Sequence, residues 1–288
     1  MNPPSSELGR VNAIVGGRAR RYEVRNFASP LSVKAVLEGT ATWTTAAGRF
    51  DLGPSGCLIV NGDEEYSIEI DALQPVETFC VFFRHGFVEE AHRSAVTGSA
   101  ALLDDSTVPP NIEFAERLQY DAQLRSAIET ERRRDGGGTA GEDAGVTFVA
   151  LAKRLVELHT DVAQRVSRLP ALRASTREEI RHRLDRAIGV IHGDLAGDLS
   201  LERIATEACL APFHFHRLFT SYSGETPHRY VTRLRLQRAA TLLAGSERPV
   251  TDIALDCGFE SAGSFTTLFS RHFGAPPSRF RKNREAAR

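Results

Sequence analysis

Between residues 30 and 84, apolar and β-branched residues form short runs separated by clusters of glycine, proline, asparagine and aspartate. The runs recur about every 8 to 12 residues, a spacing typical of the strands of a sandwich or small barrel. We therefore predict strands at residues 31–37, 40–45, 49–52, 57–60, 66–70 and 76–83. This segment is the β-rich half of the chain.

Three later stretches show helical periodicity, at residues 87–95, 112–134 and 145–168. The third carries an apolar stripe formed by Phe148, Leu151, Leu155, Leu158, Val162 and Val166. Such a stripe buries one face of a helix, either against the strands or against a second copy of the chain, and the pattern leaves both alternatives open.

Two connections follow from composition. Residues 135–145 contain five glycines and no large apolar side chain, which predicts a flexible loop. Residues 169–175 are expected to form a linker, and Ser175 or Thr176 to cap a helix that starts at Arg177.

The last third of the chain contains an internal repeat. The pair Ile204-Ala205 matches Ile253-Ala254 at an offset of 49 residues, and after one inserted residue the match continues at an offset of 50. The pairs at the second offset are Phe215 and Phe265, Leu218 and Leu268, Phe219 and Phe269, Gly224 and Gly274, Pro227 and Pro277, Arg229 and Arg279, and Tyr230 and Phe280. A fixed spacing of this length indicates one helical unit made twice.

Each unit consists of a short helix, at residues 201–208 or 250–256, then a tight turn and a second helix, which is the pattern of a helix-turn-helix. Pro212 suits the first position of the second helix in one copy, and Ser261 suits the N-cap in the other. A periodic helix at residues 227–244, ended by Gly245, joins the units. Its 18 residues span ~27 Å, comparable with the ~34 Å of one duplex turn, so both second helices could enter successive segments of one major groove.

Length and composition point to a globular protein of two domains. The chain has 288 residues, of which 41% are hydrophobic and 25% charged. The net charge of −1 conceals an asymmetry, because residues 176–288 carry 17 Lys and Arg against 13 Asp and Glu, and the rest carries 19 against 24. A basic C-terminal half is what a nucleic-acid-binding end would show, although a chance fluctuation among surface charges gives the same imbalance.

The remaining global features exclude several classes of protein. Cys57, Cys80, Cys209 and Cys257 are far apart and form no Cys-x-x-Cys pair, so we expect reduced thiols and no structural zinc. The first nine residues lack a secretory signal pattern, and no apolar run approaches 18 residues. We therefore expect a soluble, cytoplasmic protein with no membrane partner.

The repeat closely resembles the double helix-turn-helix of the AraC/XylS family of bacterial transcription regulators over about residues 177–284. The motifs that carry the resemblance are Leu201-x-x-Ile204-Ala205, Phe215-His216-Arg217-Leu218-Phe219, Gly224-x-Thr226-Pro227-x-x-Tyr230, Arg233-Leu234 with Ala239, Ile253-Ala254, Gly258-Phe259-Glu260-Ser261, Phe265, Phe269 and Gly274-x-x-Pro277-x-x-Phe280-Arg281. The resemblance implies a regulator that binds double-stranded DNA and responds to a small-molecule effector. It leaves open a contact with RNA polymerase and whether transcription rises or falls. We expect a homodimer formed through the helices between residues 112 and 168.

By this resemblance, Phe213, His216 and Arg217 in the first unit match the positions that face base edges, with His214 nearby. Arginine can donate two hydrogen bonds to O6 and N7 of guanine, and an apolar ring can touch the methyl group of thymine. Arg217 is therefore the first candidate for a base reader. The alternative is that it only neutralises a phosphate, since at least half of protein–DNA hydrogen bonds go to the backbone.

In the second unit the matching positions lie after Ser261 and are occupied by Ala262, Gly263, Thr266 and Thr267. Alanine and glycine offer only backbone groups, so we expect this unit to read sequence less sharply and to act more through phosphates. The candidate phosphate anchors are Arg271, His272, Arg281 and Lys282. Each is equally well interpreted as a solvated charge.

The strand pattern of the N-terminal half looks like the cupin-like, effector-sensing barrel that this family often carries. Metal-binding cupins have a His-x-His set before a Pro-x-Gly turn and a further His after it. Here Pro54-Ser55-Gly56 supplies the turn, but Ile59 stands at the later His position and no His-x-His precedes it. Without imidazoles a transition metal has no suitable ligands, so we expect no metal and no cofactor. The residues that could line an effector pocket are Trp43, Tyr66, Arg84 and His85, although residues of these types are more often rim or core residues.

No catalytic residue is predicted, because Gly-x-Ser-x-Gly, the phosphate-binding Gly-x-x-x-x-Gly-Lys loop and His-Glu-x-x-His are all missing. We predict an α+β chain made of a cupin-like β-barrel at residues 1–110, a helical dimerisation segment and linker at 111–175, and an all-α domain of two helix-turn-helix units at 176–288. The leading hypothesis is a sequence-specific, non-enzymatic transcription regulator. The alternatives are a metal-dependent cupin enzyme with a DNA-binding tail, and a helical interaction module that never touches DNA.

Overall fold

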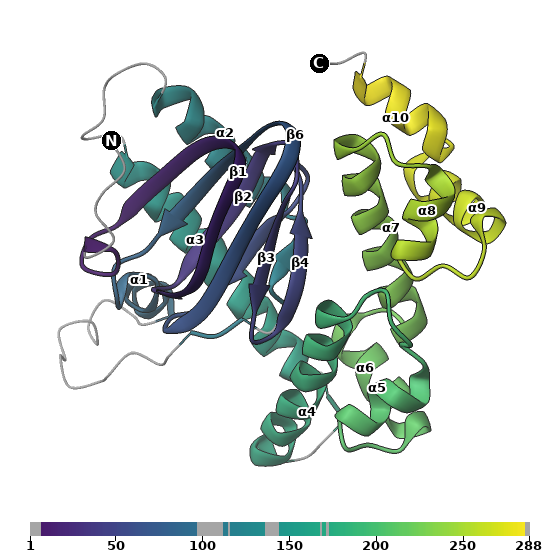
Figure 1. Cartoon of the computed structure of the whole chain (residues 1–288). Coiled ribbons are helices and arrows are strands. Elements are labelled where there is room, and N and C mark those ends of the chain that lie inside the picture. Colours follow the sequence, from purple (N-terminus) through teal and green to yellow (C-terminus); the bar gives the residue numbers. More distant parts are fainter. Residues whose placement is uncertain are drawn as a thin grey trace.

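The computed structural model describes residues 7–96, 112–114, 116–135, 144–167, 169–170 and 173–285. It has the predicted α+β architecture, with an N-terminal β-barrel and a C-terminal all-helical half (Figure 1). The strands are β1 (Ala13–Ser29), β2 (Ser32–Glu38), β3 (Ala41–Thr45), β4 (Gly48–Leu52), β5 (Cys57–Val60), β6 (Glu64–Phe82) and β7 (Leu118–Gln119). Their order is β4-β3-β6-β2-β5-β7, with β1 paired to β6, and the pairings are antiparallel.

The long strand β6 organises the barrel, because it pairs with β1 along one edge and with β2 and β3 along the other. Two separate strands were predicted here, at 66–70 and 76–83, and this division was wrong. The segment around Leu73 resembles a turn in the sequence because it is polar, and Leu73 itself is 92% exposed. The strand is nevertheless continuous, and β1 pairs with it on either side of Leu73. Strand β1 itself was not predicted, since most of its side chains are exposed or half-buried and four of them are arginines.

Three helices cover one face of the barrel, namely α1 (Phe87–Val96), α2 (Ala122–Asp135) and α3 (Ala144–Ser167). On α3, Phe148, Leu151 and Leu155 are buried in one core with the strands, and Val162 and Val166 pack against the core of the helical half. The first part of the apolar stripe therefore packs against the strands, as the first alternative had it, and its last part packs against the helical half.

Two helix starts differ from the predictions. Residues 112–114 and 116–121 are not helical, and α2 begins only at Ala122, where the carboxylate of Asp121 accepts hydrogen bonds from the backbone N–H groups of Gln123 and Leu124 at 3.0 and 2.8 Å. The later helix begins at Ala174, with Arg173 as an N-cap that makes no side-chain bond, so the expected caps at Ser175 and Thr176 were wrong. Most of the loop predicted at 135–145 and part of the linker at 169–175 lie outside the described residues.

The helical half consists of α4 (Ala174–Gly193), α5 (Leu201–Glu207), α6 (Pro212–Ser223), α7 (Pro227–Gly245), α8 (Val250–Asp256), α9 (Ala262–Phe273) and α10 (Pro277–Glu285). The repeat is visible in the backbone. Leu210 N donates to Ala205 O at 2.9 Å, and Phe259 N donates to Ala254 O at 3.0 Å. The turn residue between the short helices is left-handed in both copies, Cys209 at φ 51° and Gly258 at φ 82°. Glu260 is thus the inserted residue that shifts the offset from 49 to 50.

The two halves touch where β4 meets α4 and α7 (Figure 1). The guanidinium of Arg238 on α7 lies 2.6 Å from a carboxylate oxygen of Asp51 on β4, and this carboxylate is 10% exposed. The hydroxyl of Thr42 donates to the other oxygen of Asp51 at 2.8 Å. Beside this pair, a Cβ atom built on Gly48 would lie 2.1 Å from the Cα of Gly193 at the end of α4. Contact this close is open only to glycine.

Lys34 is an unusual member of the barrel core. Its side chain is fully buried, with Nζ 3.6 Å from the ring centroid of Phe82 and 4.4 Å from that of Tyr66. Within the described part of the chain this Nζ has no hydrogen-bond partner. Burial lowers the pKa of Lys34 to about 8, an effect opposed only in part by Cys80.

This buried amine predicts a pH-dependent stability. An unfolded lysine keeps its proton up to a pKa of about 10.4. Between pH 8 and that value the unfolded chain therefore binds more protons at this lysine, so the contribution of Lys34 to the free energy of unfolding rises with pH, by about 3 kcal/mol in all. The buried thiols of Cys57 and Cys257 act in the opposite sense because burial raises their pKa, so the contribution of Lys34 is measured as a difference between variants. From pH 7.5 to pH 10.5 the change in the free energy of unfolding, measured with urea, should be more favourable in the natural chain than in Lys34→Met by about 3 kcal/mol. The exposed Lys153→Met is the control and should behave like the natural chain; an equal change in Lys34→Met and the natural chain would contradict the assignment.

Candidate nucleic-acid interface

Helix α6 has two faces of opposite character. Phe215, Leu218, Phe219 and Tyr222 are buried in the core of the first unit. On the other side Phe213 is 82% exposed, so the helix presents an aromatic ring to solvent. Pro212 stands at the first helical position, as expected from the sequence, and fixes where this helix starts.

The predicted readers of the first unit lie together on this exposed face. His216 and Arg217 are exposed one turn after Phe213, and His214 is half-buried. A guanidinium nitrogen of Arg217 lies 3.3 Å from Nδ1 of His214. The face thus offers an aromatic ring, two imidazoles and a guanidinium, which together can contact thymine methyl groups, guanine edges and phosphates.

Helix α9 presents a much smaller chemical surface. Gly263 and Thr267 are exposed, and Ala262 and Thr266 are half-buried. Both threonine hydroxyls donate to backbone oxygens of their own helix, Thr266 to Ala262 at 2.7 Å and Thr267 to Gly263 at 3.0 Å. Their donor capacity is therefore already used, and only acceptor lone pairs remain for a base.

Ser261 and the predicted anchors serve different purposes. Ser261 is the N-cap of α9, as predicted, and its hydroxyl accepts from the backbone N–H of Ser264 at 3.2 Å. Arg281 donates to the backbone oxygen of Arg248 at 2.6 Å and so holds α10 against the loop before α8. The other three anchors are exposed, namely Arg271, His272 and Lys282.

One further pair of basic residues was missed as a site. Arg229 and Arg279 lie in the first turns of α7 and α10, each directly after a second helix of the repeat, and both are exposed. Exposed cations at a helix N-terminus suit a phosphate. The signal was in the sequence, because these arginines match at the offset of 50 although they belong to no core.

The four residues suggested for an effector pocket are not brought together. Trp43 and Tyr66 belong to the buried core of the barrel, and the Nε1 of Trp43 has no hydrogen-bond partner among the described residues. Arg84 instead pairs with Glu90 of α1 at 2.6 Å, and His85 is an exposed residue just before that helix. Lys34 was not predicted as a notable residue of the barrel. The available signal was a single lysine within an apolar strand.

The buried polar groups of the helical half support its core. The Nε2 atom of His192 on α4 lies 2.9 Å from the hydroxyl oxygen of Tyr230 on α7. Burial lowers the pKa of His192 to about 4. Among the described residues no three His, Cys, Asp or Glu side chains gather as a metal-binding group. Within the same ranges, none of the helices is both long and apolar enough to span a bilayer.

Two family models match the chain. A helix-turn-helix domain model covers residues 204–283, and an AraC-like ligand binding domain model covers residues 18–133. The HTH-type transcriptional activator RhaS of Escherichia fergusonii is 40% identical over 105 residues, which are 36% of this chain and 38% of the relative. RhaS of Klebsiella pneumoniae is 36% identical over 104 residues, 36% of this chain and 37% of the relative. The chain thus covers well under half the length of the curated relatives it matches.

The solved structures that match the chain include two. The DNA-binding domain of AdpA in complex with a target DNA is 27% identical, with 37% of this chain and 96% of that chain covered, at a TM-score of 0.36. ToxT from Vibrio cholerae is 12% identical, with 94% of this chain and 97% of that chain covered, also at a TM-score of 0.36.

Proposed function

Because this chain belongs to the AraC/XylS family of transcription regulators, we propose that it binds double-stranded DNA at specific sequences and changes transcription in response to a small-molecule effector. The observation that carries the proposal is the exposed face of α6, where Phe213, His216 and Arg217 stand opposite a fully buried aromatic core. An exposed aromatic ring and an exposed guanidinium one turn apart can together contact a thymine methyl group and a guanine edge in the major groove.

We propose that the two helix-turn-helix units contribute unequally to DNA recognition. Helix α6 reads bases through Arg217 and Phe213, whereas α9, whose threonine hydroxyls are bonded to their own helix, mainly positions the protein on the backbone. Arg271, Lys282 and the matched pair Arg229 and Arg279 supply phosphate contacts. Binding should therefore weaken steeply with salt.

The remaining parts of the proposal concern the rest of the chain. We assign the sensor to residues 1–110, the dimerisation segment and linker to 111–175 and the DNA-binding domain to 176–288. Helix α3 carries exposed Val146 and Val149 outside its buried stripe, and these suit a contact with a second copy. The activator function in the printed names of the relatives favours activation and a contact with RNA polymerase. Enzymatic cupin chemistry is disfavoured because Ile59, at the position of the metal-binding His, is buried in β5.

Arg217→Ala tests the assignment of the base reader. Loss of a bidentate contact should weaken binding to the cognate duplex by about 1 to 3 kcal/mol and relax the preference at one base pair. The matched control is Arg271→Ala, which should weaken binding to cognate and random duplexes alike and lower the salt slope by about one. Titration of labelled duplexes at several salt concentrations measures both. If Arg217→Ala weakened cognate and random DNA equally, Arg217 would be a phosphate anchor instead.

A further inference from the structure

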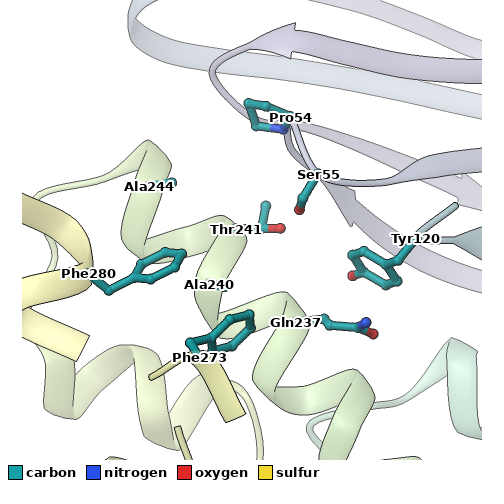
Figure 2. A pocket seen from close by; sticks show the side chains of 9 residues that line it. All are labelled: Pro54, Ser55, Tyr120, Gln237, Ala240, Thr241, Ala244, Phe273 and Phe280. Atoms are coloured by element: carbon teal, nitrogen blue, oxygen red, sulfur yellow. The ribbon is translucent and has the colours of Figure 1, made fainter. Parts of the chain in front are cut away.

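A cavity of about 240 Å³ lies between the barrel and the helical half. Its walls come from the β4–β5 loop, from the segment just before α2, from α7 and from the second helix-turn-helix unit (Figure 2). The cavity is therefore lined by both the proposed sensor and the proposed DNA-binding domain. It lies apart from the barrel interior, which is filled by buried side chains such as Trp43 and Phe82.

The walls of the cavity are divided into an apolar and a polar side. The rings of Phe273 and Phe280 stand on one side, and the hydroxyl of Ser55, the hydroxyl of Thr241 and the amide of Gln237 lie toward the other (Figure 2). Tyr120 completes the polar side. Burial raises the pKa of its phenol, so that its hydroxyl stays a hydrogen-bond donor at any physiological pH.

The lining residues carry no formal charge. A charged ligand would lose its hydration here without gaining an opposite charge, which is strongly unfavourable. An uncharged molecule with a hydroxyl or carbonyl group loses far less, because the serine, threonine, glutamine and tyrosine groups can replace its bonds to water. The volume suits a single ring or a short chain, since it is somewhat smaller than the 300 to 1,000 Å³ or so of drug-sized sites.

A second, polar cavity of about 220 Å³ shares Tyr120 and Gln237 with the first. The charged groups on its walls already have partners. Arg233 pairs with Glu225 at 2.7 Å, the carboxylate of Asp121 with Arg154 at 2.7 Å, and that of Glu116 with Arg165 at 2.8 Å. The polar end of a ligand would therefore point toward the shared wall formed by Tyr120 and Gln237.

We propose that this interdomain cavity is an effector site, which takes a small uncharged molecule with an apolar ring or chain and one or two hydroxyl or carbonyl oxygens. The regulatory role of this cavity rests on the proposed function. A ligand that touches both halves binds their docked arrangement better than any separated one, so it shifts the population toward the docked state. Because α7, α9 and α10 line the site, this shift changes how the second unit is held relative to the first, and hence DNA affinity.

The test uses the full chain and three probes of one shape, benzyl alcohol, benzoate and benzylammonium. Saturation-transfer NMR and thermal shift should show benzyl alcohol binding at least about tenfold more tightly than either charged analogue, since tenfold is only 1.4 kcal/mol and desolvating a charge costs more. Ser55→Trp, at an exposed position of the β4–β5 loop, should fill the cavity and remove this binding. Ser94→Trp, the same change at an exposed position of α1, should leave it intact.

Several outcomes would overturn the proposal. These are absence of benzyl alcohol binding, equal binding of benzoate, and binding that survives in Ser55→Trp or is lost in Ser94→Trp. If circular dichroism shows Ser55→Trp to be unfolded, Ala244→Leu fills the same cavity from α7 and decides in its place.

The DNA arm of the test keeps the two proposals apart. Saturating benzyl alcohol should change DNA affinity by about fivefold or more in the natural chain and not in Ser55→Trp. Probe binding without any change in DNA affinity would overturn the regulatory role. A chain that binds the probe but no DNA would overturn the proposed function alone.

Discussion

Gly48→Val is expected to detach the helical half from the barrel while each half stays folded. Gly48 has φ +131°, a conformation that L side chains rarely adopt, and its Cβ would lie 2.1 Å from the Cα of Gly193. No rotamer change relieves an overlap with backbone, so the end of α4 must move away from β4. The Asp51–Arg238 pair next to this contact would then separate. We expect the free energy that holds the two halves together to fall by about 3 kcal/mol or more.

Small-angle X-ray scattering and limited proteolysis measure the detachment. The radius of gyration should increase and cleavage between the halves should accelerate, with thermal unfolding split into two transitions. Gly62→Val is the matched control, because its nearest neighbour beyond the chain lies 3.8 Å from the added Cβ. Unchanged scattering for Gly48→Val would show that the halves are not held by this contact.

Phe219→Ala is expected to lower the free energy of unfolding by about 3 to 5 kcal/mol and to abolish DNA binding. Phe219 is fully buried, with its ring centroid 5.3 Å from that of Phe215 and 5.3 Å from that of Tyr230 on α7. Removing this ring leaves a cavity where α6 rests on α7, so the reading helix loses its orientation as well as its support.

Phe213→Ala, on the same helix, separates support from recognition. Because Phe213 is 82% exposed, its loss should change stability by no more than about 0.5 kcal/mol and still weaken cognate binding by about 1 kcal/mol or more. Denaturant titrations and duplex titrations of the two variants give the comparison. If Phe213→Ala destabilised the fold as strongly as Phe219→Ala, the exposed face of α6 would be a packing surface.

The repeat could be predicted because each matched aromatic serves a local core. Phe215 and Phe265, for example, pack within their own units, so the offset of 50 in the sequence translates directly into two similar folds. Strand β1 could not be predicted from the sequence. Its exposed arginines leave no alternating apolar face, and the strand is held mainly by backbone pairing with β6.

The start of helix α2 was predicted too early because the period of the apolar residues was followed without a capping residue. The apolar residues Ile112 and Phe114 fit a helical period, yet they are buried in the core beneath the barrel, and the helix begins only after Asp121 provides a cap. Asp121 followed by a helical pattern is a readable cap signal that was passed over.

Contacts between the halves were beyond sequence reasoning. The cavity assembles Ser55, Tyr120, Thr241 and Phe273, which are far apart in the chain and belong to different elements. Nothing in the local pattern around any of them indicates a ligand. Similarly, Gly48 resembles an ordinary turn residue in the sequence. Only the structure shows that the backbone of Gly193 lies against it.

Selection of duplexes from a random library by the full chain measures whether the chain reads DNA sequence mainly through α6. We expect one enriched motif of two blocks about one helical turn, ~10 base pairs, apart, with one block sharply specified and the other weakly. Repeated with Arg217→Ala, the selection should relax a base pair in the sharp block only. Absence of any enriched motif, or a motif that Arg217→Ala leaves unchanged, would contradict recognition through α6.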